Sequence, residues 1–125
     1  MRTKVLLIED DRRLVDVISL ELKLLGYDVA VAVSGREGLK KADDFSPDAI
    51  VIDIRLPRME GLRTVAQIRK SPKTKSLPIL AISGMTRPGD KKKCLDAGCD
   101  GYLVKPFTHR ELGAAIRTLL SKKNS

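Results

Sequence analysis

The sequence predicts an α/β fold, in which helices cover both faces of one parallel β-sheet. Five short apolar segments alternate strictly with five segments that carry apolar residues at helical spacing. The central run "AIVIDI", residues 49–54, lacks the polar alternation of a half-exposed strand, so it fits a strand buried on both faces. The length of 125 residues fits a single domain, which we expect to span residues 1–125.

Each expected strand is a short run of aliphatic and β-branched residues. Five strand–helix units with right-handed crossovers favour a flavodoxin-like (βα)5 three-layer sandwich with sheet order 2-1-3-4-5. The expected strands are residues 4–9, 27–33, 48–54, 77–83 and 101–106.

Signals at the helix ends support the same order of elements. Gly26 follows the apolar pattern of the first helix and should end it. Ser34 with Glu37, and Thr108 with Glu111, have the spacing of capping boxes at helix starts. The expected helices cover residues 11–25, 34–45, 61–70 and 88–97, and a last helix begins near residue 108.

Composition excludes several classes of protein. No apolar run approaches the ~20 residues of a membrane helix, and the four apolar residues before Glu9 are too few for a signal peptide. We therefore expect a cytoplasmic protein with no membrane partner. Cys94 and Cys99 lack zinc-site spacing, so they are expected to be free thiols.

The net charge of +8 fits either an acidic partner such as nucleic acid or a solvated basic surface. Basic residues are spread over several segments, and two phenylalanines and two tyrosines are too few for a base-stacking platform. We favour the solvated surface over nucleic-acid binding by this domain itself.

Side chains suited to phosphate chemistry stand at the carboxyl ends of four expected strands, where such sheets bind ligands. Glu9 and Asp10 end the first strand, Asp53 the third, Ser83 the fourth and Lys105 the fifth. Converging carboxylates require a cation or raised pKa values, and oxygen ligands select a hard ion, above all Mg²⁺. A carboxylate beside Mg²⁺, an ammonium and a hydroxyl can accept a phosphoryl group.

Helix capping is the alternative explanation for these acids. Asp10 or Asp11, taken alone, would suit the N-cap of the helix that follows. Asp53 fits that explanation poorly, because Pro57 and Gly61 place a loop between it and the next helix. The four rim positions together favour a functional site.

Four segments resemble the receiver domain of two-component response regulators, and the match covers essentially the whole chain. "VLLIEDD" resembles the acidic end of that family's first strand, and "VIDIRLPRMEG" resembles its phosphoacceptor motif D-x-x-[LM]-P-x-M-[DN]-G. "AISG" resembles the strand that carries a hydroxyl, and "AGCDGYLVKPF" resembles the K-P-F signature of this chemotaxis-regulator-like family. The separations between Asp53, Ser83 and Lys105 also fit the family.

The resemblance implies a role for each site residue. Asp53 would take a phosphoryl group from a histidine kinase or a phosphotransfer protein, in a domain that assists its own Mg²⁺-dependent phosphorylation and dephosphorylation without being an enzyme. Asp10, Asp53 and the backbone carbonyl of Arg55 would bind Mg²⁺ (or Mn²⁺), and Glu9 would orient metal-bound water. Lys105 would pair with Asp53 or with its phosphate.

The resemblance also implies a switch. Ser83 would donate a hydrogen bond to the phosphate and Tyr102 would change rotamer, which would alter the face of the fourth helix, fifth strand and fifth helix for an unknown downstream target. The Lys105–Pro106 bond would be cis. Glu60 departs from the usual Asp or Asn of the motif, and the Arg55 side chain should lean over the site entrance and tune the lifetime of the phosphate.

Two other functions share parts of this pattern. A flavodoxin-like FMN binder would need a phosphate-cradling loop after the first strand, but "EDDRR" is acidic there. A P-loop hydrolase would need a lysine where Asp90 stands in "GMTRPGDK". The chain could be a single-domain regulator or the receiver part of a longer protein.

Overall fold

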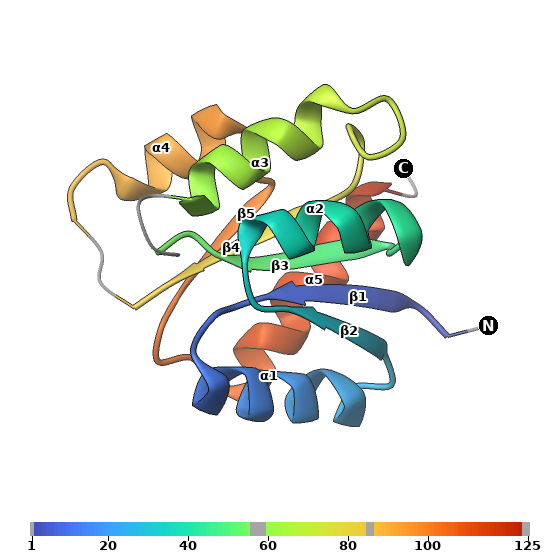
Figure 1. The fold of residues 1–125 in the computed structure, drawn as a ribbon. Helices are drawn as coiled ribbons and strands as arrows, with labels where there is room; N and C mark the ends of the chain where they lie inside the picture. Colours follow the sequence, from blue (N-terminus) through green and yellow to red (C-terminus); the bar gives the residue numbers. More distant parts are fainter. Residues whose placement is uncertain (1, 56–59, 85–86, 124–125) are drawn as a thin grey trace.

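The computed structural model describes residues 2–55, 60–84 and 87–123, and it contains one parallel five-stranded sheet (Figure 1). The strand order is β2-β1-β3-β4-β5, and every neighbouring pair is parallel. This is the predicted flavodoxin-like order. The strands are β1 Lys4–Ile8, β2 Asp28–Ala32, β3 Ala49–Asp53, β4 Ile79–Ser83 and β5 Gly101–Val104.

A helix follows each strand, and the helices form two layers. α1 and α5 cover one face of the sheet, while α2, α3 and α4 cover the other (Figure 1). The predicted three-layer sandwich is therefore confirmed. The helices are α1 Arg12–Leu24, α2 Gly35–Asp44, α3 Glu60–Lys70, α4 Asp90–Ala97 and α5 His109–Lys123.

The two layers explain why the central strands are apolar at nearly every position. In β3, Ile50 and Ile52 pack into the core beneath α2, α3 and α4, while Val51 packs into the core beneath α1 and α5. Successive side chains of a strand point to opposite faces, so a strand covered on both faces needs an unbroken apolar run. β3 is buried along its whole length, and this fixes the position of Asp53 at its end.

The predicted capping signals form hydrogen bonds at the helix starts. The Ser34 hydroxyl accepts from the Glu37 N–H at 3.1 Å. Thr108 and Glu111 form a reciprocal box, with bonds of 2.9 and 3.0 Å. These bonds satisfy N–H groups that have no partner inside the helix, so α2 and α5 begin where the sequence predicts.

α4 is the least anchored of these helices. It begins at Asp90 rather than at the predicted residue 88, because Gly89 takes a left-handed conformation with φ 89° and provides no side-chain cap. Cys94 is its one buried residue. α4 therefore depends on few contacts for its position.

Both cysteines are free, as predicted, and both are buried in the core beneath α2, α3 and α4. Burial raises the pKa of Cys99 to about 12, so this thiol stays protonated at neutral pH. Among the helices in the described part of the chain, none is both long and apolar enough to cross a bilayer.

Candidate phosphoacceptor site

The sheet brings the predicted site residues to one edge. Asp53 is the last residue of β3, and β3 lies between β1, which leads into Glu9, and β4, which ends in Ser83. Lys105 directly follows β5, and its backbone N–H donates to the Ser83 carbonyl at 2.8 Å. The carboxyl ends of four strands thus place the candidate residues at one rim, as the strand order requires.

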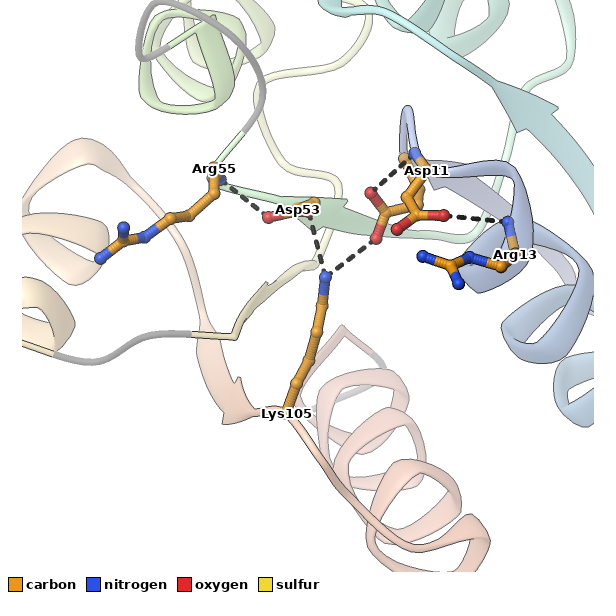
Figure 2. Close-up of polar contacts among 6 residues, drawn as sticks. Asp11, Arg13, Asp53, Arg55 and Lys105 are labelled. Atoms are coloured by element: carbon orange, nitrogen blue, oxygen red, sulfur yellow. Dashed lines mark hydrogen bonds and ion pairs between the residues drawn. The ribbon is translucent and has the colours of Figure 1, made fainter.

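Three of these residues form a charged triad, Glu9, Lys105 and Asp53. The Lys105 Nζ lies 3.1 Å from Glu9 Oε1 and 3.1 Å from Asp53 Oδ2 (Figure 2). Glu9 is 0% exposed and Asp53 is 5% exposed, so both carboxylates are nearly sealed from water. A single ammonium therefore bridges two buried acids, an arrangement that leaves the triad short of positive charge.

The shortage of positive charge is reflected in the pKa of Glu9. Burial, together with the hydrogen bond and charge of Asp53, raises the pKa of Glu9 to about 7 against the opposing effect of Lys105. For Lys105, burial alone would lower the pKa, but the hydrogen bond to Glu9 and the charge of Asp53 outweigh burial and raise it. Lys105 is thus held as a cation, while the site retains room for further positive charge.

Backbone N–H groups hold the two buried carboxylates in place. The Arg55 N–H donates to Asp53 Oδ1 at 2.8 Å, and the Asp11 N–H approaches Glu9 Oε2 at 3.4 Å. With Lys105 on the other oxygen of each carboxylate, both acids have fixed orientations (Figure 2). A carboxylate held from both sides presents its remaining lone pairs in one direction.

An acidic cluster of Glu9, Asp10 and Asp53 offers oxygen ligands to a cation. One carboxylate oxygen from each residue lies within 4.8 Å of the others, and Asp10 is exposed while its two partners are buried. Oxygen ligands at the edge of a cleft suit Mg²⁺, which keeps several water ligands. Burial, followed by the hydrogen bond and charge of Asp53, raises the pKa of Glu9, as expected where carboxylates gather without enough positive charge. These residues therefore fit a magnesium site.

The structure distinguishes Asp10 from Asp11, two adjacent acids that the sequence left as alternative caps of the first helix. Asp11 is the N-cap of α1, and its carboxylate accepts from the Arg13 N–H at 3.0 Å (Figure 2). Asp10 instead belongs to the acidic cluster. The capping explanation thus holds for Asp11, while Asp10 lies where the resemblance placed it.

Ser83 and Tyr102 occupy the predicted positions on neighbouring strands. Ser83 is fully buried at the end of β4, one strand away from Asp53. Tyr102 pairs with Ala81 across β4 and β5 and is half-buried against the core beneath α2, α3 and α4. The Lys105–Pro106 bond is cis, as expected.

The Arg55 side chain differs from its prediction. Its guanidinium points away from Asp53 (Figure 2), and its Nη2 pairs with Asp90 Oδ2 at 3.4 Å. Asp90 is the first residue of α4 and attracts the guanidinium by charge. The expectation that this side chain leans over the site entrance is wrong for this state of the protein.

Glu60 has a function that the sequence did not reveal. Its Oε1 accepts from the Gly35 N–H at 3.0 Å, so a side chain of α3 caps the start of α2. The two residues are 25 positions apart, and no local signal predicts such a contact. The expected loop-forming residue Pro57 lies outside the described residues.

A groove of about 440 Å³ lies beside the triad, between α1 and the segment after β5. Leu14, Val17 and Ile18 of α1 form one side, and Phe107 lies on the other. Lys105 also lines it, so the groove is continuous with the triad. The sequence did not reveal this groove, because the helical pattern of α1 does not show which apolar residues stay exposed.

The sequence-family model described as the response regulator receiver domain matches residues 5–117 of this chain. This chain belongs to that family. The response regulator ArlR of Staphylococcus saprophyticus is 40% identical to it over 121 residues, which are 97% of this chain and 54% of ArlR. The chain spans about half the length of the curated relatives it matches.

Solved structures of receiver domains share the fold of this chain. The chemotaxis response regulator CheY4 of Vibrio cholerae has a TM-score of 0.88 and 33% identity, covering 95% of this chain and 99% of CheY4. The receiver domain of the sensor histidine kinase PA1611 from Pseudomonas aeruginosa has a TM-score of 0.86 and 34% identity, and each chain is covered completely. That domain was crystallised with a magnesium ion coordinated in its active site cleft.

The chain is thus a receiver domain of two-component signal transduction, and its acidic pocket around Asp53 fits the role of a phosphoacceptor. The FMN-binding and nucleic-acid-binding alternatives are not favoured by these findings.

Proposed function

We propose that Asp53 accepts a phosphoryl group from the phosphohistidine of a histidine kinase or a phosphotransfer protein. The P–N bond of the donor breaks, a P–O bond to an Asp53 carboxylate oxygen forms, and the imidazole nitrogen keeps the electron pair of the broken bond. The observation that supports this proposal is the position of Asp53 next to Lys105 and within the acidic cluster. A buried carboxylate with an adjacent ammonium can take up the group without large rearrangement.

Asp10 and Asp53 would hold Mg²⁺ (or Mn²⁺), together with the backbone carbonyl of Arg55, and Glu9 would orient water on the metal. The cation would supply positive charge to the phosphoryl oxygens. Lys105 would move its contact from the Asp53 carboxylate to the phosphoryl group, because that group carries more negative charge and more acceptor oxygens. The protein would thus assist its own phosphorylation and dephosphorylation while remaining a signalling domain rather than an enzyme.

The groove beside the triad would receive the phosphodonor protein. Val17 is 53% exposed and lines the groove, which shares Lys105 with the acceptor site. Glu21 Oε2, in the same groove, is buried and finds no hydrogen-bond partner among the described residues. A partner with apolar side chains and a nearby hydrogen-bond donor would complement both features.

Ser83 and Tyr102 would transmit the phosphorylation of Asp53 to the protein surface. We propose that the Ser83 hydroxyl donates to the phosphoryl group and that Tyr102 changes rotamer in response. The surface formed by α4, β5 and α5 would then differ between the two states and bias binding of a downstream protein. We further propose that residues 1–125 form a single receiver domain that acts in the cytoplasm.

The direct test is an intact-mass measurement after incubation with acetyl phosphate and Mg²⁺. We expect the mass to increase by one phosphoryl group, and we expect no increase for Asp53→Ala or after removal of Mg²⁺ with a chelator. An unmodified wild-type protein would contradict the proposed function. An adduct on Asp53→Ala would contradict the assignment of the acceptor, and flavin absorbance of the purified protein would favour the FMN alternative.

A further inference from the structure

The Arg55–Asp90 ion pair connects the phosphoacceptor to α4. The backbone N–H of Arg55 is bonded to Asp53 Oδ1 at 2.8 Å, while its guanidinium lies 3.4 Å from Asp90 Oδ2 at the start of α4. One residue therefore contacts the acceptor through its backbone and α4 through its side chain. Figure 2 shows the side chain directed away from Asp53 and from Lys105.

Asp90 organises the start of α4. Its Oδ2 accepts from the Arg87 N–H at 2.9 Å and also pairs with Arg55. The hydrogen bond from Arg87, followed by the charge of Arg55, holds the pKa of Asp90 below its usual range. Because Gly89 provides no side-chain cap and Cys94 is the one buried residue, the first turn of α4 depends strongly on Asp90.

The Arg55–Asp90 pair has the properties of a contact that Arg55 can give up for another partner. Arg55 Nη2 lies 3.4 Å from Asp90 Oδ2, at the long end of the hydrogen-bond range, and the side chain of Arg55 is 35% exposed. Such pairs contribute little to stability. A phosphoryl group carries a charge of about −1.5 to −2 and several acceptor oxygens, so it can bind a guanidinium through two hydrogen bonds.

We propose that Asp90 is a positioning residue that holds the Arg55 guanidinium away from Asp53, and that phosphorylation of Asp53 draws Arg55 onto the phosphoryl oxygens and loosens the start of α4. The inference rests on the proposed function of Asp53. Asp90 and the phosphoryl group compete for one guanidinium. By linkage, each therefore weakens the other's hold on Arg55 by the same factor.

The competition should be visible in the lifetime of the acyl phosphate. In hydrolysis a water oxygen bonds to phosphorus, the P–O bond to Asp53 breaks, and inorganic phosphate and the free carboxylate remain. A guanidinium drawn onto the phosphoryl oxygens covers the side from which water attacks, and we expect this covering to outweigh the transition-state charge stabilisation that the guanidinium adds, so hydrolysis slows. Asp90 thus shortens the lifetime by withholding Arg55.

The experiment measures loss of the phosphoryl group by intact mass, after the protein has been phosphorylated with acetyl phosphate and the donor removed. We expect Asp90→Asn to lengthen the half-life about two- to five-fold, the range of a weak ion pair. Arg55→Ala should shorten it, and Asp90→Asn should have no effect in the Arg55→Ala background. Asp96→Asn is the matched control, because it removes a carboxylate from the same helix that pairs with Lys92 instead.

A second readout is hydrogen exchange at the start of α4. We expect phosphorylation to increase exchange there in the wild type and to leave it unchanged in Arg55→Ala. If Asp90→Asn alters the half-life equally with and without Arg55, or no more than Asp96→Asn does, the inference is overturned while the proposed function stands. A wild-type protein that takes up no phosphoryl group overturns both.

Discussion

Two groups of charges lie at the same edge of the sheet, and they differ in burial. The charged triad is nearly closed to water, with side chains of Glu9, Asp53 and Lys105 that are 0, 7 and 16% exposed. The Arg55–Asp90 pair is partly exposed through its cation, because the Arg55 side chain is 35% exposed while the Asp90 side chain is 15% exposed. The triad also has short contacts of 3.1 Å, against 3.4 Å in the pair.

The difference shows how one fold can hold a reactive group still and let its surroundings change. Breaking a buried ion pair leaves charges without compensation, so in the unphosphorylated protein the triad keeps its partners. A surface pair gains little from its contact, so it can exchange partners when a new charge appears nearby. Burial of charge thus fixes Asp53, and the partial exposure of Arg55 permits the exchange that we propose at the start of α4.

The largest effect should come from breaking the triad with Lys105→Met. This change leaves Glu9 and Asp53 buried without their cation, and we expect a loss of about 3 kcal/mol in the free energy of unfolding at pH 8. Urea denaturation without Mg²⁺ measures it. Lys92→Met removes the exposed Lys92–Asp96 pair and should cost less than about 0.5 kcal/mol. Equal losses for the two variants would contradict the distinction between the triad and surface pairs.

The raised pKa of Glu9 predicts that the folding stability of the wild type depends on pH. Its pKa rises from 4.5 in the unfolded chain to about 7 in the folded protein, so the folded state binds the proton more tightly. The contribution of Glu9 to stability is then fully present below pH 4.5 and is lost as the pH rises through 7. We expect the Glu9→Gln variant to show a smaller loss of stability than the wild type between pH 5 and 8, measured by denaturation without Mg²⁺.

The same titration predicts how Mg²⁺ binds. A cation in the acidic cluster displaces the proton of Glu9, so the affinity for Mg²⁺ should increase from pH 6 to pH 8. Calorimetry in buffers with different ionisation enthalpies measures the proton release. An affinity that is independent of pH over this range would show that Glu9 is not coupled to the cation.

A further effect, on transfer from a phosphodonor protein, is expected in the groove beside the triad. Val17→Glu places a charge in the groove without disturbing the core, so transfer from a phosphodonor protein should slow by roughly tenfold. Phosphorylation by acetyl phosphate should not change. Leu24→Glu is the control, since Leu24 is 71% exposed on α1 but does not line the groove. If both variants slow the transfer equally, the groove is not the docking site.

Sequence reasoning predicted the features that local patterns encode. The strand runs, the helix caps at Ser34 and Thr108 and the end of β3 at Asp53 depend on residues close together in the chain. The strand order then brings Glu9, Asp53 and Lys105 to one rim. These predictions succeeded because parallel strands place their carboxyl ends together.

The features that sequence reasoning missed join distant residues. The Glu60–Gly35 bond spans 25 positions and the Arg55–Asp90 pair spans 35, and neither follows from a pattern along the chain. α4 begins two residues later than predicted because Gly89 turns into a left-handed conformation. Long, flexible polar side chains have several possible partners, and only the packed fold selects one.

The most direct test of the central claim is to locate the phosphoryl group on the chain. The protein is phosphorylated with acetyl phosphate and Mg²⁺, the acyl phosphate is reduced with borohydride, and the resulting homoserine is found by tandem mass spectrometry of peptides. We predict homoserine at position 53 and at no other aspartate. A modification at Asp10, or an unreduced phosphate on Ser83, would contradict the assignment of Asp53 as the phosphoacceptor.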